Sequence, residues 1–266
     1  MNAIFSNLKR NQQKGSKPRC HLLTDGSNEQ VATNLTRLIE GWGSVGSDDQ
    51  WMPSGFEDSE EAQLHDAPRL LDVSSYGQAL KSWWFAAHGG AQMSPNWDIA
   101  STCTIEGRKG LLLIEAKAHD AELINEEAGR AMKAPVTTNS RRNHERIGSC
   151  IRDASLALTG ETKLPWALSR EWNYQMANRF TWSWKLTELG LPVILVYLGF
   201  LRAEEMRKSD YSAPFADDSE WDSLVRAHSE PLFPTQVWNQ RWKLHGQPFI
   251  PLIRSIEQPL DVACGV

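Results

Sequence analysis

The chain has 266 residues, 41% of them hydrophobic, and a formal net charge of −5. This length and apolar fraction suffice for a packed domain with a sizeable core, whereas the negative charge excludes a global basic field, so a nucleic-acid partner would need a local basic patch or a metal. No apolar run approaches the roughly 18 residues of a membrane span, so we expect a soluble protein without a membrane partner.

The N-terminal segment is basic, and the first predicted helix follows it. Residues 1–26 include the stretch LKRNQQKGSKPR, which lacks the apolar centre of a signal peptide and indicates a flexible basic arm. Ser27 and Gln30 have the spacing of a capping box, which predicts a helix from there to about Glu40, ending at Gly41.

A loop and a second helix are predicted next. Residues 43–67 are acidic, contain glycine and have no period, which is typical of a loop or linker. The stretch YGQALKSWWFAA, residues 76–87, is predicted to be a helix that ends at the HGG of residues 88–90.

A β-hairpin is predicted after this helix. Residues 97–105 are rich in β-branched side chains, residues 110–118 are strongly apolar, and EGRKG between them has glycines where a turn needs them. The loop is expected to hold two residues, Gly107 and Arg108, or the four residues around them.

Charged side chains interrupt the apolar second strand of this hairpin. With a loop of two or four residues, Asp98 would lie opposite Lys117. Glu115 and Lys117 share a face because side chains alternate along a strand, and the diagonal from Asp98 to Glu115 would be roughly 7 Å between Cβ atoms. A loop of three or five residues, or a bulge near Asp98, would put Asp98 on the other face.

This predicted cluster has a structural and a functional interpretation. A structural ion pair between Asp98 and Lys117, with Glu115 in solvent, is the ordinary outcome for such residues. Burying unpaired charges in an apolar strand is costly, however, and this favours a functional site. Two carboxylates beside an ammonium suit a divalent cation such as Mg²⁺ or Mn²⁺.

Two further helices and a buried strand are predicted after a polar and basic connection. The first helix covers residues 143–160, where apolar side chains follow a 3.6-residue period. The second covers residues 171–190 and leads into a β-branched strand at residues 193–200. The apolar row of the first helix comprises Ile147, Cys150, Ile151, Ala154 and Leu158, and that of the second Trp172, Met176, Phe180 and Trp184.

The order of helices, hairpin, helices and strand predicts a mixed α/β fold. We expect a single domain over residues 27–266, with its core at about 75–200 and a C-terminal extension at about 201–266.

The spacing of the charged residues resembles that of the PD-(D/E)xK phosphodiesterase superfamily, which has the restriction-endonuclease-like fold. PNWD is followed after sixteen residues by EAK at the end of an apolar strand. The resemblance implies a mixed central sheet flanked by helices, a metal held by Asp98, Glu115 and the carbonyl of Ala116, and Lys117 assisting the attacking water. The chain departs from the pattern in that Pro95 stands three residues before the aspartate. The upstream glutamate of many members is unassigned among Glu29, Glu40, Glu57, Glu60 and Glu61.

A second element is similar to the helix with a Q-x-x-x-Y pattern in exonuclease-type members. Gln175 matches the glutamine and Arg179 stands where the tyrosine would be. Both lie on one predicted helix face, opposite the apolar row, where they could grip a phosphate, although both could instead face water. His119 is a candidate outer contact to metal or phosphate, against the alternative of a surface histidine.

A basic stretch after the hairpin is the candidate phosphate track. A solvated basic loop is the alternative. The track comprises Arg130, Lys133, Arg141, Arg142 and Arg146.

Cysteine and tryptophan usage adds two expectations. The four cysteines are Cys20, Cys103, Cys150 and Cys264, and they lack the spacing of a zinc knuckle or a disulfide framework, which favours a reducing cytoplasm. The twelve tryptophans favour a tryptophan-rich core over a stacking surface.

These observations predict a Mg²⁺- or Mn²⁺-dependent nuclease that hydrolyses phosphodiester bonds of DNA or RNA, with DNA the first expectation. The alternative is a catalytically silent nucleic-acid-binding or assembly protein on the same fold. A glycosidase acting through Asp98 and Glu115 is a third interpretation, which Lys117 between them fits poorly. The sequence does not decide whether the nucleic acid is cut at its ends or internally. It also leaves the sequence specificity, the biological pathway and the oligomeric state undetermined.

Overall fold

The computed structural model describes residues 13–86, 94–127, 129–132, 134, 136–208 and 212–260. An open sheet of six strands runs through its centre in the order β1-β2-β3-β4-β6-β5. Strands β3, β4 and β6 are parallel to one another, and the remaining pairings are antiparallel, so the sheet is mixed. The strands are β1 Trp51–Met52, β2 Ile99–Ile105, β3 Arg108–Lys117, β4 Val193–Leu201, β5 Trp242–Leu244 and β6 Gln247–Glu257. The predicted mixed α/β class is confirmed.

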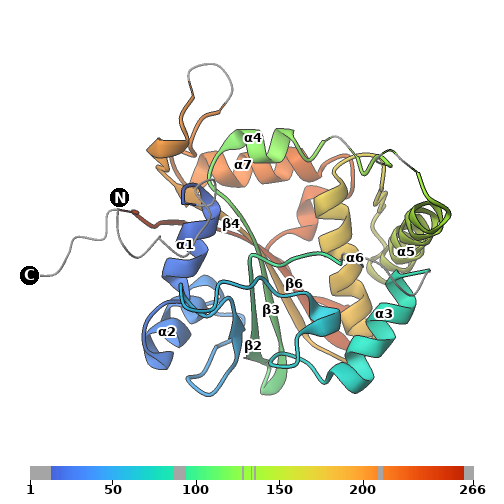
Figure 1. Cartoon of the computed structure of the whole chain (residues 1–266), viewed down its shortest axis with the longest axis horizontal. Coiled ribbons are helices and arrows are strands. Elements are labelled where there is room, and N and C mark those ends of the chain that lie inside the picture. Colours follow the sequence, from blue (N-terminus) through green and yellow to red (C-terminus); the bar gives the residue numbers. More distant parts are fainter. Residues whose placement is uncertain are drawn as a thin grey trace, which may run out of the picture.

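Helices cover both faces of the sheet. Figure 1 shows α1 and α2 on one side and α3, α5 and α6 on the other. The helices are α1 Ser16–Leu23, α2 Asn28–Leu38, α3 Gln78–Trp84, α4 Asp120–Ile124, α5 Thr138–Thr162, α6 Tyr174–Glu188 and α7 Asp218–Ser229. Short helical turns lie at Leu64–Asp66, Val73–Gly77, Glu204–Met206 and Thr235–Val237. Among the described residues, no helix has the length and apolar character needed to cross a membrane.

Strand β4 is apolar on both faces because it is central and parallel, and helices cover it from both sides. Ile194, Val196 and Leu198 pack in one apolar cluster with α1 and α2. Val193 and Leu195 pack in the other, with α6. The side chains of the neighbouring strand β3 are divided between the same two clusters. The face on which a β3 residue lies therefore determines whether its charged side chain is directed toward α6 or toward α1 and α2.

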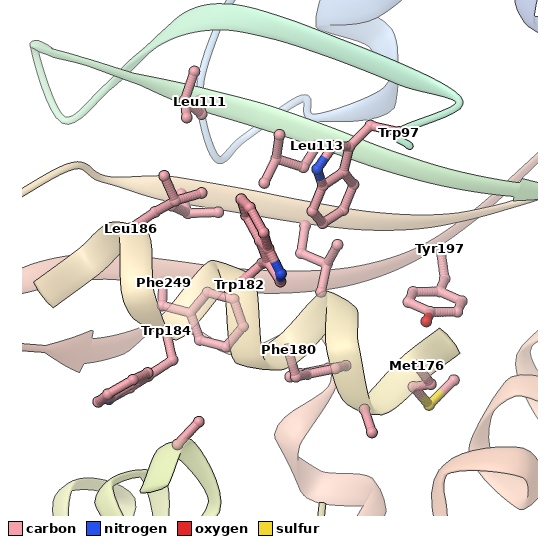
Figure 2. Packing of buried hydrophobic residues seen from close by; sticks show 14 of the residues in the cluster. Trp97, Leu111, Leu113, Met176, Phe180, Trp182, Trp184, Leu186, Tyr197 and Phe249 are labelled. Atoms are coloured by element: carbon pink, nitrogen blue, oxygen red, sulfur yellow. The ribbon is translucent and has the colours of Figure 1, made fainter. Parts of the chain in front are cut away.

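Tryptophans and phenylalanines of α6 fill the second cluster. Phe180 and Trp182 are fully buried, and Figure 2 shows Trp182 between α6 and the strands, with Trp97 approaching from before β2. Eight of the twelve tryptophans are buried, so the core interpretation is confirmed; these eight are Trp51, Trp84, Trp97, Trp166, Trp182, Trp184, Trp221 and Trp238. Trp172 is 46% exposed, which makes its place in the predicted apolar row wrong: α6 begins only at Tyr174, after a left-handed residue.

The hairpin register differs from the prediction by one pair. Ile105 pairs with Arg108, so the loop is Glu106 and Gly107 rather than Gly107 and Arg108. Both loop residues have positive φ, at 50° and 73°, as a type I′ turn requires, and the glycine takes the second central position. The register extended beyond Ile99 places Asp98 opposite Glu115 instead of Lys117. The shift moves each partner by two residues, so Asp98 stays on the predicted face.

The N-terminal half contains two elements that the sequence analysis missed. Residues 16–23, expected as part of a flexible arm, form helix α1, in which Arg19 is 2% exposed and forms an ion pair with Glu205. Residues 43–67, expected as a loop, contain β1, where Trp51 pairs with Ser101. The predicted capping of α2 is confirmed, since the Ser27 side chain accepts a hydrogen bond from the Gln30 amide.

The later elements also have different bounds from those predicted. Helix α5 begins at Thr138, so the basic residues expected in a connection before residue 143 are partly helical. The predicted extension contributes β6, which lies between β4 and β5 in the sheet, so the core does not end near residue 200. Residues 88–90, predicted to end a helix, lie outside the described residues.

Candidate active site

Glu115 and Lys117 project from β3 toward α6 at the carboxyl end of the strand. Leu111 and Leu113 precede them on the same face and pack in the cluster of α6. Both charged residues are buried, with exposed fractions of 1% and 5%. An apolar strand face therefore ends in a buried carboxylate and a buried ammonium, which need partners because unpaired burial is costly.

Glu115 obtains these partners from β3 and α6. Its Oε1 accepts hydrogen bonds from the Nζ of Lys117 at 2.5 Å and from the Nε2 of Gln175. Its Oε2 accepts one from the Nε of Arg179 at 2.6 Å. The structure therefore brings Gln175 and Arg179 together on one helix face, turned toward Glu115.

Arg179 is engaged within the protein rather than free to grip a phosphate. Its Nη1 donates to the Oδ1 of Asn178 at 3.0 Å and its Nη2 to the carbonyl of Asn96 at 2.7 Å. The guanidinium lies 4.6 Å from the ring centre of Trp97, in the geometry of a cation–π contact. Burial lowers the pKa of Arg179, but Glu115 outweighs this and the pKa is raised. Arg179 thus acts here as a fixed counter-charge of Glu115.

Asp98 joins the cluster from just before β2. Its Oδ2 accepts a hydrogen bond from the amide of Ala116 at 2.8 Å, which fixes it against β3. Asp98 is half-buried, whereas Glu115 and Lys117 are buried. Burial raises the pKa of Asp98 well above its ordinary value, and the carboxylate of Glu115 raises it further, against the opposing effect of Lys117. An ionised Asp98 is therefore short of positive charge.

The shortage of positive charge around an ionised Asp98 is the observation that fits a bound cation. Asp98 and Glu115 offer hard carboxylate oxygens, the donors that Mg²⁺ and Mn²⁺ prefer. A complete ligand set is not formed, since no group of three or more His, Cys, Asp or Glu side chains suited to a metal occurs in the described parts of the chain. Glu115 also has donors on both oxygens already. The two carboxylates fit as part of a divalent-cation site in which a metal would share Glu115 with Arg179 and Lys117.

Glu61 is linked to this cluster, and its carboxylate contributes to the raised pKa of Asp98. It accepts hydrogen bonds from the Nζ of Lys17 at 2.6 Å and from the Nδ2 of Asn96 at 3.3 Å, while the carbonyl of Asn96 accepts from Arg179. These contacts place Glu61 next to the residues that surround Asp98 and Arg179.

Lys117 has a second carboxylate partner that the sequence analysis missed. Its Nζ lies 2.6 Å from the Oε1 of Glu126, which follows α4. Burial lowers the pKa of Lys117, but Glu115, Glu126 and Asp98 together outweigh it and raise the pKa. Lys117 therefore remains an ammonium that can donate hydrogen bonds and stabilise negative charge, but does not accept a proton.

The sequence analysis also missed His228 and Tyr197. The Nε2 of His228 lies 3.4 Å from the Oε2 of Glu126, and Tyr197 on β4 is in register with Glu115. No motif marks these residues, since Glu126 lies in a charged segment without periodicity and His228 in the unassigned tail. These residues are identified only by the pairing of β3 with β4 and by the packing of α7, and both require the three-dimensional structure.

The remaining candidates lie outside the cluster of Asp98, Glu115 and Lys117. His119 is largely buried, and its Nε2 lies 3.9 Å from the Oε2 of Glu122. Arg130 contacts the ring of Tyr174, next to Gln175, with its guanidinium 5.2 Å from the ring centre. Three other residues of the predicted phosphate track are exposed on α5, and they are Arg141, Arg142 and Arg146. Lys133 lies outside the described residues.

Comparisons with protein-family models, with curated proteins and with solved structures each returned no match. Function therefore has to be argued from the geometry of the site.

Proposed function

We propose that this chain is a metal-dependent phosphodiesterase acting on nucleic acid, with the restriction-endonuclease-like fold of the PD-(D/E)xK type. The observation that carries the proposal is the convergence of Asp98, Glu115 and Lys117 with Gln175 at the carboxyl end of β3. Strand β3 lies between an antiparallel partner and a parallel one in a mixed sheet, which suits that fold. The glycosidase alternative is weaker, because Lys117 is paired directly with Glu115.

Asp98 and Glu115 would hold Mg²⁺ or Mn²⁺, together with the carbonyl of Ala116. When bound, such an ion supplies Lewis-acid polarisation of a phosphoryl oxygen. Lys117 stays protonated and stabilises negative charge that develops beside Glu115. Gln175 fixes both side chains, since its amide donates to Glu115 and its oxygen accepts from Lys117 at 3.3 Å.

The proposed substrate is DNA, with RNA as the second possibility. A chain with a net charge of −5 has to bind a polyanion locally, through Arg130 and the exposed arginines of α5. A cytoplasmic location is part of the proposal. Cys20, Cys103 and Cys150 are free and buried, and Cys264 lies outside the described residues.

A catalytically silent binding or assembly protein is the second candidate, and one observation favours it. Glu115 is 1% exposed and already neutralised by Arg179 and Lys117, so the motif is closed in the described arrangement. A protein that keeps the fold but no longer catalyses a reaction would be expected to neutralise these charges internally in this way. The half-buried Asp98 is the member of the cluster through which a metal and a phosphate would enter.

A cleavage assay separates the two candidates. Single-stranded, duplex and flapped DNA and RNA are incubated with the protein in Mg²⁺, in Mn²⁺ and in a chelator. We expect metal-dependent cleavage that falls by roughly two to three orders of magnitude in Lys117→Ala, because one donor that stabilises developing negative charge is lost, while substrate affinity stays nearly unchanged. Thermal unfolding of the variant verifies that it is folded under the assay conditions.

Metal binding is measured separately by calorimetry. Asp98→Asn is expected to weaken binding of Mg²⁺ or Mn²⁺ strongly, whereas the exposed Asp48→Asn serves as the matched control and leaves it unchanged. Absence of cleavage on every substrate, with nucleic-acid binding retained, would establish the silent binder instead. Cleavage that survives unchanged in Lys117→Ala would refute the role given to the lysine.

A further inference from the structure

Lys117 is held between two carboxylates that come from different parts of the fold. Glu115 approaches its Nζ at 2.5 Å from within β3, and Glu126 approaches it at 2.6 Å from the turn after α4. The side chains of Lys117 and Glu126 are each 6% exposed. The second contact is therefore a buried ion pair, with little solvent to screen it.

Glu126 is itself held by α7. The Nε2 of His228 lies 3.4 Å from its Oε2, and the His228 side chain is 4% exposed. The carbonyl of His228 accepts a hydrogen bond from the Nδ2 of Asn173 at 2.5 Å, and Asn173 directly precedes α6. Helix α6 carries Gln175, which contacts Lys117, so the chain of contacts returns to the ammonium.

The local charges show why a second carboxylate is present. Lys117 and Arg179 both lie against Glu115, so these three buried side chains, counted without the half-buried Asp98, carry one positive charge in excess. Glu126 removes that excess. Burial raises the pKa of Glu126, but Lys117 and His228 outweigh it and the pKa is lowered, so Glu126 is ionised.

We propose that Glu126 is a positioning residue that fixes the ammonium of Lys117, and that His228 holds Glu126 in place; this rests on the proposed function. An ammonium on a flexible four-carbon stem has many rotamers, and contact with Glu115 alone would leave it free to turn. Two carboxylates, one from β3 itself and one from the turn after α4, restrict it to one position. A buried ion pair adds little net stability, which makes geometry the stronger reason for this one.

Kinetics test the proposal in the full chain. Glu126→Gln keeps the shape of the side chain and removes its charge, and it should lower kcat by about tenfold to a hundredfold, as for residues that orient an active-site group. KM should change by less than about twofold, because Glu126 does not contact substrate. Glu126→Asp should recover part of kcat, and His228→Asn should give a smaller loss. Glu127→Gln is the matched control, since Glu127 is the exposed neighbour, and should match the wild type.

A second measurement does not depend on activity. Nuclear magnetic resonance of ¹⁵N-lysine protein reports the side-chain ammonium of Lys117, identified by the loss of its signal in Lys117→Arg. In Glu126→Gln the ammonium protons should exchange with water at least about tenfold faster, whereas in Glu127→Gln the rate should not change.

The outcomes separate the two proposals. If the wild type cleaves no substrate, the proposed function fails, and the exchange rates still decide whether Glu126 fixes Lys117. If Glu126→Gln leaves both kcat and the ammonium exchange unchanged, the positioning role is overturned. A variant that only unfolds at lower temperature, with kcat per folded molecule unchanged, overturns it as well and leaves Glu126 a structural ion pair.

Discussion

Arg179 places a permanent positive charge against Glu115, at the position where the resemblance leads one to expect a tyrosine. Together with Lys117 and Gln175, Arg179 gives both carboxylate oxygens of Glu115 hydrogen-bond donors from within the protein. Motif spacing, strand alternation and the resemblance together pointed to Asp98, Glu115, Lys117 and Gln175, which the structure brings together at the end of β3. The partners of Arg179 could not be found this way, since Asn96 and Trp97 meet it only through the packing of α6 on the sheet.

Replacing Arg179 by Met should expose the competition between the arginine and a metal. Loss of one partner of a buried ion pair costs about 3–5 kcal/mol, so the free energy of unfolding should fall by that amount in a chelator. Mg²⁺ should restore more stability to Arg179→Met than to the wild type, because Glu115 then lacks its main counter-charge. Chemical denaturation with and without Mg²⁺ measures both effects. Equal Mg²⁺ stabilisation of the two proteins would show that the metal, if bound, does not share Glu115 with Arg179.

Asp49 provides a pH-dependent prediction away from the site. Burial raises its pKa, but Lys109, Thr102 and the Gly46 amide outweigh this, and the pKa of Asp49 is lowered. A lowered folded pKa means that its stabilisation is fully present above the ordinary value of 3.8 and is lost as the pH falls through the folded value. Asp49→Asn should therefore cost about 1–3 kcal/mol at neutral pH.

Denaturation curves at a series of pH values measure this cost. The difference between wild type and Asp49→Asn should be constant near neutrality and shrink as the pH falls below the ordinary value of 3.8, because there the unfolded chain takes up a proton before the folded carboxylate does. The exposed Asp48→Asn serves as the control. If the difference in the free energy of unfolding stays constant down to the lowest pH measured, the lowered pKa of Asp49 is contradicted.

At the scale of elements, the type I′ turn of the hairpin and the position of α7 are where the sequence analysis fell short. Glycine patterns predicted a turn between β2 and β3, but the expected loop was Gly107 and Arg108 or the four residues around them, whereas the observed loop is Glu106 and Gly107. Both Glu106 and Gly107 have positive φ, which the sequence pattern did not indicate for the glutamate. Helix α7 could not be placed from the sequence, because its position depends on a close approach between Trp221 and Gly199 of β4.

This close approach yields a prediction for α7. A Cβ atom at Gly199 would lie 2.6 Å from the Trp221 ring, so Gly199→Ala forces the helix away from the sheet. Overpacking of this kind costs about 1–3 kcal/mol, to be measured by urea denaturation. The control is Gly160→Ala within α5, where the added methyl meets open space and should stabilise the helix by about 0.8–1 kcal/mol. Equal stability of Gly199→Ala and wild type would show that α7 does not pack on β4 as described.

At the scale of the whole molecule, the sequence predicted the α/β class but missed the strand that completes the sheet. Strand β6 contains Pro248 and Pro251, and proline is unfavourable inside a sheet because it cannot donate a ladder hydrogen bond. The structure accommodates Pro251 because β5 is short and pairs only with residues 247–249. The composition of such a strand hides it from pattern analysis, and the pairing with β4 is what makes it central.

The distribution of charge over the molecule gives the last prediction. A chain with a net charge of −5 repels a polyanion overall. Substrate binding should therefore depend on the few arginines near the N-terminal end of α5, which begins at Thr138. Arg142→Ala should weaken binding and lower the slope of log affinity against log salt by about one, with kcat unchanged. Lys243→Ala removes the same charge from an exposed position on β5, beside the other end of α5, and should leave the slope unchanged. Fluorescence anisotropy with labelled DNA across a salt series measures both variants. Equal loss of slope in the two would mean that binding follows total charge, and it would refute the arginines of α5 as the phosphate track.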